Sequence, residues 1–371
     1  MIHIIKPIRI LAALACLLLA AAACQPAPRV ESQGDYILQI TQIDTTNFPV
    51  VDVYVSVQDA SGEPQVINTG KLQLLENGQP VQGQSIRGVG EADPLTTLLV
   101  IDNSGSMNFA NKLDSAKAVA KQYLAQMRPN DQAGIITFNT KVQTVKEITT
   151  DRQALEAAVD GIQAKDDTAI YDALLVAVQQ LNPLPGRKAI ILMTDGMDNR
   201  SSALPDDVLG SIGFGGLSIS TVGFGEIPEG VEDPDAYAGI DEAVMRRIAE
   251  DAGGRYGYAA NESELSALYS QMQRALQSEA VISYTTPLAL RDGVLRALTV
   301  TLSDRYLGVG GESRTGYNPG GLVPEVAQPA SWLTFGIILA VLIVLLLIPV
   351  LYQVIVQRKP SKRKVRIKLK D

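Results

Sequence analysis

The chain has 371 residues, of which 46% are hydrophobic, and a formal net charge of −8 at pH 7. This length exceeds what one average domain needs, and the negative charge argues against nucleic-acid or heparin-like partners. The two cysteines, Cys16 and Cys24, and the single histidine, His3, all lie in the first 24 residues. The remaining chain therefore has no disulfide, no Ser-His-Asp or Cys-His catalytic group and no conventional zinc site.

Residues 1–24 have the layout of a secretory signal peptide. Lys6 and Arg9 precede an apolar run at residues 10–23, which ends in three alanines before Cys24. Residues 21–24 resemble a bacterial lipobox, so Cys24 is a candidate lipidation site and the protein is expected to be bacterial. Ordinary cleavage nearby and an uncleaved anchor are the alternatives, and all three place the following residues on the same side of the membrane. The polar residues 25–34 suit a short tether.

A second apolar segment, residues 332–356, has no charged side chain. At about 1.5 Å per helical residue it is long enough to cross a hydrocarbon core of about 30 Å, and we predict a single transmembrane helix. Eight basic residues follow between positions 358 and 370, and the positive-inside rule places this tail, residues 357–371, in the cytoplasm. The expected location is the cytoplasmic membrane, with the body of the protein outside the cytoplasm.

Strand-like patterns occur on both sides of a longer central segment. The N-terminal β region, residues 35–92, has predicted strands at 36–40, 50–57 and 71–75. The C-terminal β region, residues 280–321, has predicted strands at 280–285 and 295–302, then Gly-rich turns and a linker at 322–331. Because neither region alone has enough strands, we expect one small β-sandwich-like layer into which the central segment is inserted. Two separate β appendages are the alternative.

The central segment, residues 93–279, alternates short apolar strands with amphipathic helices. This alternation is typical of an α/β fold with a doubly wound, mostly parallel sheet. Strands are predicted at residues 97–101, 131–138, 188–193 and 217–224. Helices are predicted at residues 112–127, 152–163, 170–181, 241–251 and 262–277.

A D-x-S-x-S pattern, Asp102-Asn103-Ser104-Gly105-Ser106, stands at the end of the first of these strands, where such folds bind ligands. Carboxylate and hydroxyl oxygens suit a hard cation such as Mg²⁺, and Gly105 permits a sharp turn between the serines. A Ser-rich turn that caps the helix starting near Asn111 is the alternative. Two further elements favour the cation site over the capping turn: Thr168 just before a predicted helix, and Thr194-Asp195-Gly196 at the end of a predicted strand.

The sequence resembles the von Willebrand factor A-type (VWA) family at the five positions of a complete metal-ion-dependent adhesion site: Asp102, Ser104, Ser106, Thr168 and Asp195. Residues 134–138, 221–225, 247–249 and 253–256 also carry family features. The resemblance implies a Rossmann-like fold that binds Mg²⁺, Mn²⁺ or Ca²⁺. It further implies direct metal contact from the hydroxyls of Ser104 and Ser106, with Asp102 and Asp195 acting largely through water. Thr168 joins on ligand binding, and an acidic residue of the partner completes the coordination. Leftover motif residues with a structural role are the alternative.

Other acidic residues near these positions raise a question. Asp166 and Asp167 precede Thr168 where many relatives have glycine, and their charge could strengthen metal binding or repel an acidic partner. Asp198 raises the same question, with a solvated loop as the simpler interpretation. The acidic stretch at residues 226–235 matches no EF-hand spacing, which favours a solvated loop over a second calcium site.

The leading hypothesis is a non-enzymatic, divalent-metal-dependent module that binds an unknown protein or surface ligand outside the cytoplasmic membrane, in adhesion or complex assembly. The alternative is a membrane-tethered envelope assembly scaffold with a mainly structural metal. An enzyme ranks third, because the residues beyond the signal leave only metal-assisted hydrolysis open. A further hypothesis is that the helix at residues 262–277 shifts on ligand binding, as in some relatives, and transmits occupancy toward the membrane.

Overall fold

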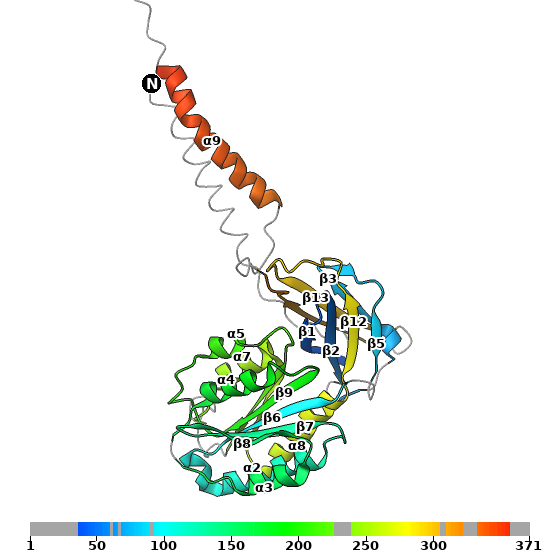
Figure 1. Ribbon diagram of the computed structural model, residues 1–371, viewed down its shortest axis with the longest axis vertical. Coiled ribbons are helices and arrows are strands. Elements are labelled where there is room, and N and C mark those ends of the chain that lie inside the picture. Colours follow the sequence, from blue (N-terminus) through cyan, green and yellow to red (C-terminus); the bar gives the residue numbers. More distant parts are fainter. Residues whose placement is uncertain are drawn as a thin grey trace, which may run out of the picture.

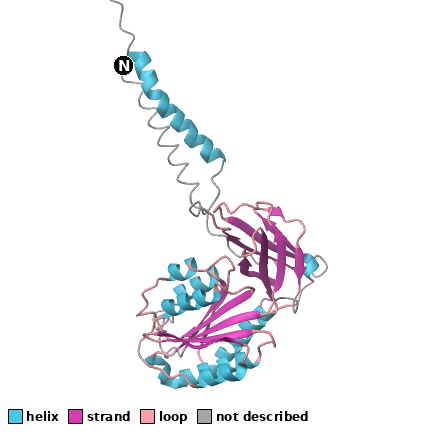
Figure 2. Cartoon of the chain, viewed as in Figure 1, coloured by secondary structure: helices cyan, strands magenta, loops and turns pink. Residues whose placement is uncertain are grey.

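The computed structural model describes residues 36–59, 62–65, 68–88, 93–165, 167–225, 239–304, 309–321 and 332–356. Several predicted features lie outside these residues: the signal peptide with Cys24, the tether, the linker at 322–331, the basic tail, Asp166 and the acidic stretch at 226–235. Within the described residues the chain forms an α/β unit, a β unit and a long helix (Figures 1 and 2).

A six-stranded sheet forms the centre of the α/β unit, with the strand order β11-β10-β9-β6-β7-β8. Its strands are β6 (Leu95–Asp102), β7 (Gln132–Phe138), β8 (Val142–Thr149), β9 (Arg187–Thr194), β10 (Ser218–Phe224) and β11 (Gly253–Ala259). Neighbouring strands run parallel except β7 and β8, which form an antiparallel hairpin. The predicted α/β fold with a mostly parallel sheet is thus confirmed, and β8 and β11 are strands that the sequence patterns do not predict.

Helices cover both faces of this sheet (Figure 1). One face carries α2 (Lys112–Ala125), α3 (Arg152–Asp160) and α8 (Glu262–Gln277), and the other carries α4 (Ile170–Leu181), α5 (Pro205–Gly210) and α7 (Glu242–Asp251). Alternate residues of β6 divide between the two cores, with Leu99 and Ile101 in the first and Leu98 and Val100 in the second. A strand does this because successive side chains point to opposite faces of the sheet.

The β unit consists of two four-stranded sheets, with the orders β1-β2-β12-β5 and β14-β13-β3-β4. Its strands are β1 (Tyr36–Asp44), β2 (Val50–Asp59), β3 (Leu72–Glu76), β4 (Gln79–Pro80), β5 (Ser85–Arg87), β12 (Ala280–Thr285), β13 (Arg296–Asp304) and β14 (Val309–Tyr317). Both sheets combine strands from before and after the α/β unit, because β12 pairs with β2 and β5 and β13 pairs with β3. Side chains of both sheets, such as Val53, Leu74, Ile282 and Val300, share one core. In the stretch where glycines suggest turns, residues 309–317 instead form β14.

A buried polar network joins the two units. The side-chain amide of Gln42 in β1 donates to the carbonyl oxygens of Gly186 and Gly215 at 2.9 and 2.8 Å, and its oxygen accepts the N–H of Lys188 at 3.0 Å. At the start of β9, Arg187 donates to Glu279 Oε2 from Nε at 2.9 Å and from Nη2 at 2.6 Å. Glu279 directly precedes β12, so this ion pair fixes the point where α8 leads into the β unit.

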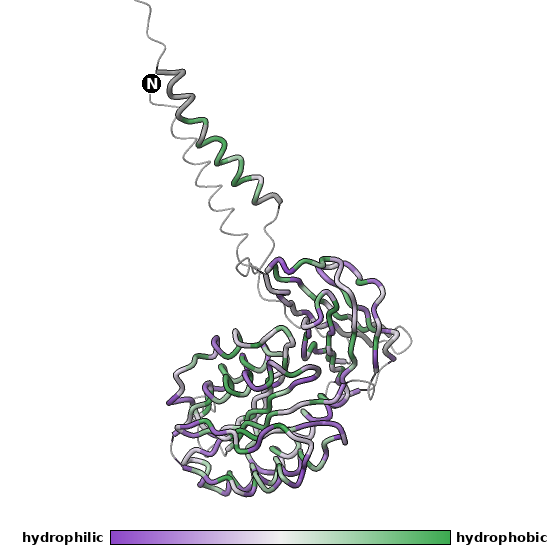
Figure 3. The backbone as a smooth tube through the Cα atoms, in the orientation of Figure 1, coloured by the Kyte–Doolittle hydropathy of each residue, from purple (hydrophilic) through white to green (hydrophobic). Residues whose placement is uncertain are grey.

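The long helix α9 (Trp332–Val356) occupies the residues predicted to cross the membrane. Apolar side chains of this helix, such as Ile338, Val341 and Val344, are exposed, and its apolar stretch is visible in Figure 3. Taken over the residues that the structure describes, no helix meets both the length and the apolarity needed to cross a membrane.

Replacing Glu279 by alanine is expected to lower the free energy of unfolding by about 3–5 kcal/mol, because Arg187 would keep a buried charge without its carboxylate partner. The side chains of Arg187 and Glu279 are only 1% and 3% exposed. Urea unfolding followed by circular dichroism measures the loss. The control is Glu63→Ala, which removes an exposed partner of Arg274 and should cost less than about 1 kcal/mol. Equal losses in the two variants would contradict the role of the buried pair.

Candidate metal centre

The strand order of the α/β unit reverses between β6 and β9. From β6 the chain continues to β7 on one side, whereas β9 and β10 lie on the other. In open α/β sheets, ligands bind beyond the carboxyl ends of the strands at such a reversal. Asp102 is the last residue of β6 and Asp195 directly follows β9, so both carboxylates stand at the place where the fold accommodates a ligand.

Asp102 is a fully buried carboxylate. Its Oδ1 accepts the backbone N–H of Ser104 at 2.7 Å, and its Oδ2 accepts the hydroxyl of Thr194 at 2.6 Å. Burial raises the pKa of Asp102 to about 6, and the nearby Asp195 adds to the increase, while the hydrogen bonds from Thr194 and Ser104 oppose it. These donors are neutral, so ionised Asp102 is an incompletely compensated charge that a cation would stabilise.

The hydroxyls of Ser104 and Ser106 face each other beside the second carboxylate. Their Oγ atoms are 3.0 Å apart, and the Ser106 hydroxyl donates to Asp195 Oδ1 at 2.7 Å. Two ligands at right angles around Mg²⁺, each roughly 2.0–2.1 Å from the ion, are about 2.9 Å apart. The spacing of the two hydroxyls therefore fits neighbouring positions in one coordination shell. Among the described residues no group of three or more His, Cys, Asp or Glu could hold a metal. The candidate donors here are two carboxylates and two hydroxyls.

Thr168 lies in the adjoining loop, just before α4. Its backbone N–H donates to Asn199 Oδ1 and its carbonyl accepts the Asn199 N–H, both at 3.1 Å. A Cβ placed on Gly196 would lie 3.7 Å from Thr168 Oγ1, so this hydroxyl borders the loop that follows Asp195. The structure thus connects Asp102, Ser104, Ser106 and Asp195 through hydrogen bonds and brings Thr168 alongside them.

Two of the additional acidic residues already have partners. Asp167 pairs with Arg200 at 2.7 Å, which balances its charge. Asp198 Oδ2 accepts the N–H groups of Ile170 at 2.6 Å and Tyr171 at 3.2 Å, at the N-terminus of α4. The interpretation of Asp198 as a solvated loop residue is therefore wrong, because its carboxylate caps the helix and faces the positive end of the helix dipole.

Three further residues shape the site without being marked by the motif. Thr194 holds Asp102, and Lys112 donates from Nζ to Asp195 Oδ2 at 2.7 Å. The Asn103 side chain donates to the Gln163 carbonyl at 2.8 Å, which fixes the chain that leads toward Thr168. Thr194 and Asn103 are adjacent in sequence to motif residues and could have been suspected. No local sequence pattern marks Lys112, because its partner Asp195 follows β9 and is distant in the sequence.

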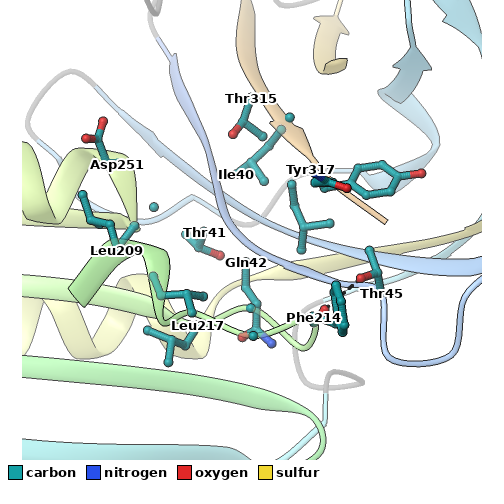
Figure 4. A pocket seen from close by; sticks show the side chains of 18 of the residues that line it. Ile40, Thr41, Gln42, Thr45, Leu209, Phe214, Leu217, Asp251, Thr315 and Tyr317 are labelled. Carbon is teal, nitrogen blue, oxygen red and sulfur yellow. Dashed lines mark hydrogen bonds between the residues drawn. The ribbon is translucent and has the colours of Figure 1, made fainter. Parts of the chain in front are cut away.

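A cavity of about 430 Å³ lies between the two units (Figure 4). Its lining includes Thr41 and Gln42 of β1, Leu217 just before β10, and Gly253 at the start of β11. Leu217 and Gly253 are at the amino-terminal ends of the parallel strands β10 and β11. The cavity therefore belongs to the opposite edge of the sheet from Asp102 and is not part of the candidate metal centre.

Residues 97–197 match the family model of the von Willebrand factor type A domain. The α/β unit carries a VWA domain. Similar sequences include a UPF0353 protein of Mycobacterium leprae, 29% identical over 235 residues, with 57% of this chain and 70% of the relative covered. A solved structure of a von Willebrand factor type A protein from Catenulispora acidiphila is 15% identical, with a TM-score of 0.44, and covers 79% of this chain and 74% of its own. BatB from Bacteroides thetaiotaomicron, a conserved hypothetical protein, is 24% identical, with a TM-score of 0.40, and covers 50% of this chain and 100% of its own.

Replacing Asp198 by alanine is expected to lower the free energy of unfolding of the VWA domain by about 1–2 kcal/mol, because the N-terminus of α4 would lose its cap. Thermal or urea unfolding measures this loss. Asp206→Ala is the matched control, since Asp206 forms an exposed pair with Arg247 and its loss should cost less than about 1 kcal/mol. If the two variants are equally stable, Asp198 does not act as a cap.

Proposed function

We propose that this protein is a non-enzymatic module that binds a protein or surface ligand through a divalent metal, in adhesion or complex assembly outside the cytoplasmic membrane. The observation that supports it most is the convergence of Asp102, Ser104, Ser106 and Asp195 at the strand reversal, with two buried carboxylates and two hydroxyls at coordination spacing. Oxygen donors of this kind suit Mg²⁺, with Mn²⁺ and Ca²⁺ as alternatives.

The residues of the site would have different roles in metal binding. The hydroxyls of Ser104 and Ser106 would hold the ion directly, and Asp102 and Asp195 would hold its water shell. The backbone N–H of Ser104 and the hydroxyl of Thr194 keep the Asp102 carboxylate in place, as outer partners of a metal site do. A bound divalent ion supplies a positive centre that a carboxylate of a partner can join. Thr168, which borders the Asp195 loop, would contribute its hydroxyl when that ligand binds.

The proposed location rests on the sequence of the chain. The uncharged residues of α9 and the basic residues after it favour a single membrane anchor with the VWA domain on the extracytoplasmic side. Cys24 is proposed as a lipid attachment site at the other end of the body. Both attachments would tether the body of the protein to the membrane.

Calorimetric titration of the purified full-length protein with Mg²⁺ or Mn²⁺ is expected to show saturable binding near one equivalent. An Asp102→Ala, Ser104→Ala double variant should lose this binding, because one carboxylate and one hydroxyl of the same shell are removed. Asp160→Ala removes an exposed carboxylate that pairs with Lys121 and serves as the control. Binding that survives in the double variant would place the metal elsewhere.

Thr168→Ala is expected to retain metal binding within about threefold but to weaken ligand capture at least tenfold, since Thr168 is proposed to act only in the ligand-bound state. The measurement is Mg²⁺-dependent retention on immobilised Glu-containing and Asp-containing peptides, with their Gln and Asn counterparts as controls.

Capture that is unaffected by chelation, combined with a melting temperature that falls when the metal is removed, would instead support an assembly scaffold with a structural metal. Metal-dependent ester or phosphate hydrolysis that is lost in Asp195→Ala would favour an enzyme.

A further inference from the structure

The two carboxylate oxygens of Asp195 have different partners, a hydroxyl and a cation. Oδ1 accepts the hydroxyl of Ser106 and Oδ2 accepts the ammonium of Lys112, each at 2.7 Å. The carboxylate of Asp195 is fully buried, whereas the Lys112 side chain is 20% exposed. The second carboxylate of the candidate metal centre thus already has a positive partner within the chain.

The backbone before α2 is shaped to bring Lys112 to this position. A short 3₁₀ segment, η2 (Gly105–Asn111), contains Ser106 and is anchored by the fully buried Met107. Ala110 and Asn111 then adopt left-handed conformations, with φ values of 52° and 54°, which non-glycine residues rarely do. This turn lets Ser106 and Lys112, which are close in sequence, reach different oxygens of the same carboxylate.

The contact between Lys112 and Asp195 is enclosed as well as short. A Cβ placed on Gly225, just after β10, would lie 3.3 Å from Lys112 Nζ and 3.5 Å from its Cε. The lysine therefore lies between the ends of β9 and β10, beside Asp195. Burial of the carboxylate makes the ion pair stronger than an exposed one, because the local dielectric constant is lower.

We propose that Lys112 is an internal counter-cation of the metal centre: it stabilises Asp195 before metal binds, lowers the affinity for the metal, and leaves the loaded site with excess positive charge. This inference rests on the proposed function. Asp102 and Asp195 together balance a divalent ion, and Lys112 adds one positive charge in contact with the same carboxylate. Like charges that share one carboxylate repel each other. The loaded site therefore favours an anionic ligand over a neutral one, and its metal is easier to exchange.

The test is calorimetric titration of the full-length protein with Mn²⁺. Lys112→Met keeps the length of the apolar stem and removes the charge, so Mn²⁺ should bind about tenfold more tightly than in the wild type. Lys112→Arg keeps the charge and should bind as the wild type does. Lys121→Met, which removes an exposed lysine from the same helix, is the control for net charge and should change the affinity by less than about twofold.

Thermal unfolding without and with Mn²⁺ gives a second measurement that a purely structural role of Lys112 would not reproduce. Lys112→Met should melt at a lower temperature than the wild type without metal, because Asp195 loses its partner, and Mn²⁺ should raise its melting temperature by more than in the wild type. Lys112→Gln provides a second neutral variant if Lys112→Met does not fold.

The outcomes separate this inference from the proposed function. If both proteins bind Mn²⁺ but Lys112→Met binds it no more tightly than the wild type, the role of Lys112 is overturned and the metal centre stands. Tighter binding that is matched by Lys121→Met also overturns it, because the effect would then come from net charge alone. An absence of Mn²⁺ binding in both proteins overturns the proposed function together with this inference.

Discussion

The position of Asp102 and Asp195 at the ends of two adjacent parallel strands is the constraint on which the candidate site depends. Neighbouring strands lie about 4.8 Å apart, so the adjacent ends of β6 and β9 bring the segments that carry the two carboxylates close together. Two carboxylates so close, and so well buried, are unfavourable unless positive charge or hydrogen-bond donors offset them. The hydroxyls of Thr194 and Ser106, the N–H of Ser104 and the ammonium of Lys112 are the groups that do so within the described part of the chain.

The opposite edge of the same sheet is organised by a different requirement, which is to satisfy backbone groups where the parallel strands begin. Buried backbone polar groups need hydrogen-bond partners, and β1 of the β unit supplies them with two glutamine side chains. Gln39 donates to the carbonyl oxygens of Gly253 and Gly254, at 3.1 and 2.7 Å, while Gln42 does the same beside β9 and β10. The β unit is therefore a structural base for the α/β unit, and the metal-site edge remains free of it.

The parts of the fold that sequence predicts well are those with strong local periodicity. The helices predicted at residues 170–181 and 262–277 coincide with α4 and α8, because their apolar residues recur at helical spacing. The edge strand β8 has no buried residue, so it lacks the apolar run by which buried strands are recognised. In β11 the glycines obscure the strand pattern. Within the site, the D-x-S-x-S residues are local, whereas the contacts of Lys112 and Asp198 join distant segments and follow only from the three-dimensional arrangement.

The insertion of the α/β unit into the β unit has a mechanical consequence. The segments that enter and leave it are neighbours, since Arg87 at the end of β5 pairs with Val281 next to the start of β12. A pull on the outer edge of the α/β unit would therefore be shared between two antiparallel strands at the same end of one sheet. Tension between Tyr36 and Tyr317 would follow another path, because β1 and β14 are in contact and the Ile40 N–H donates to Ser313 Oγ at 3.1 Å. Such tension would act on the β unit and would not be transmitted through the inserted α/β unit, which would keep its shape while the β unit is stretched.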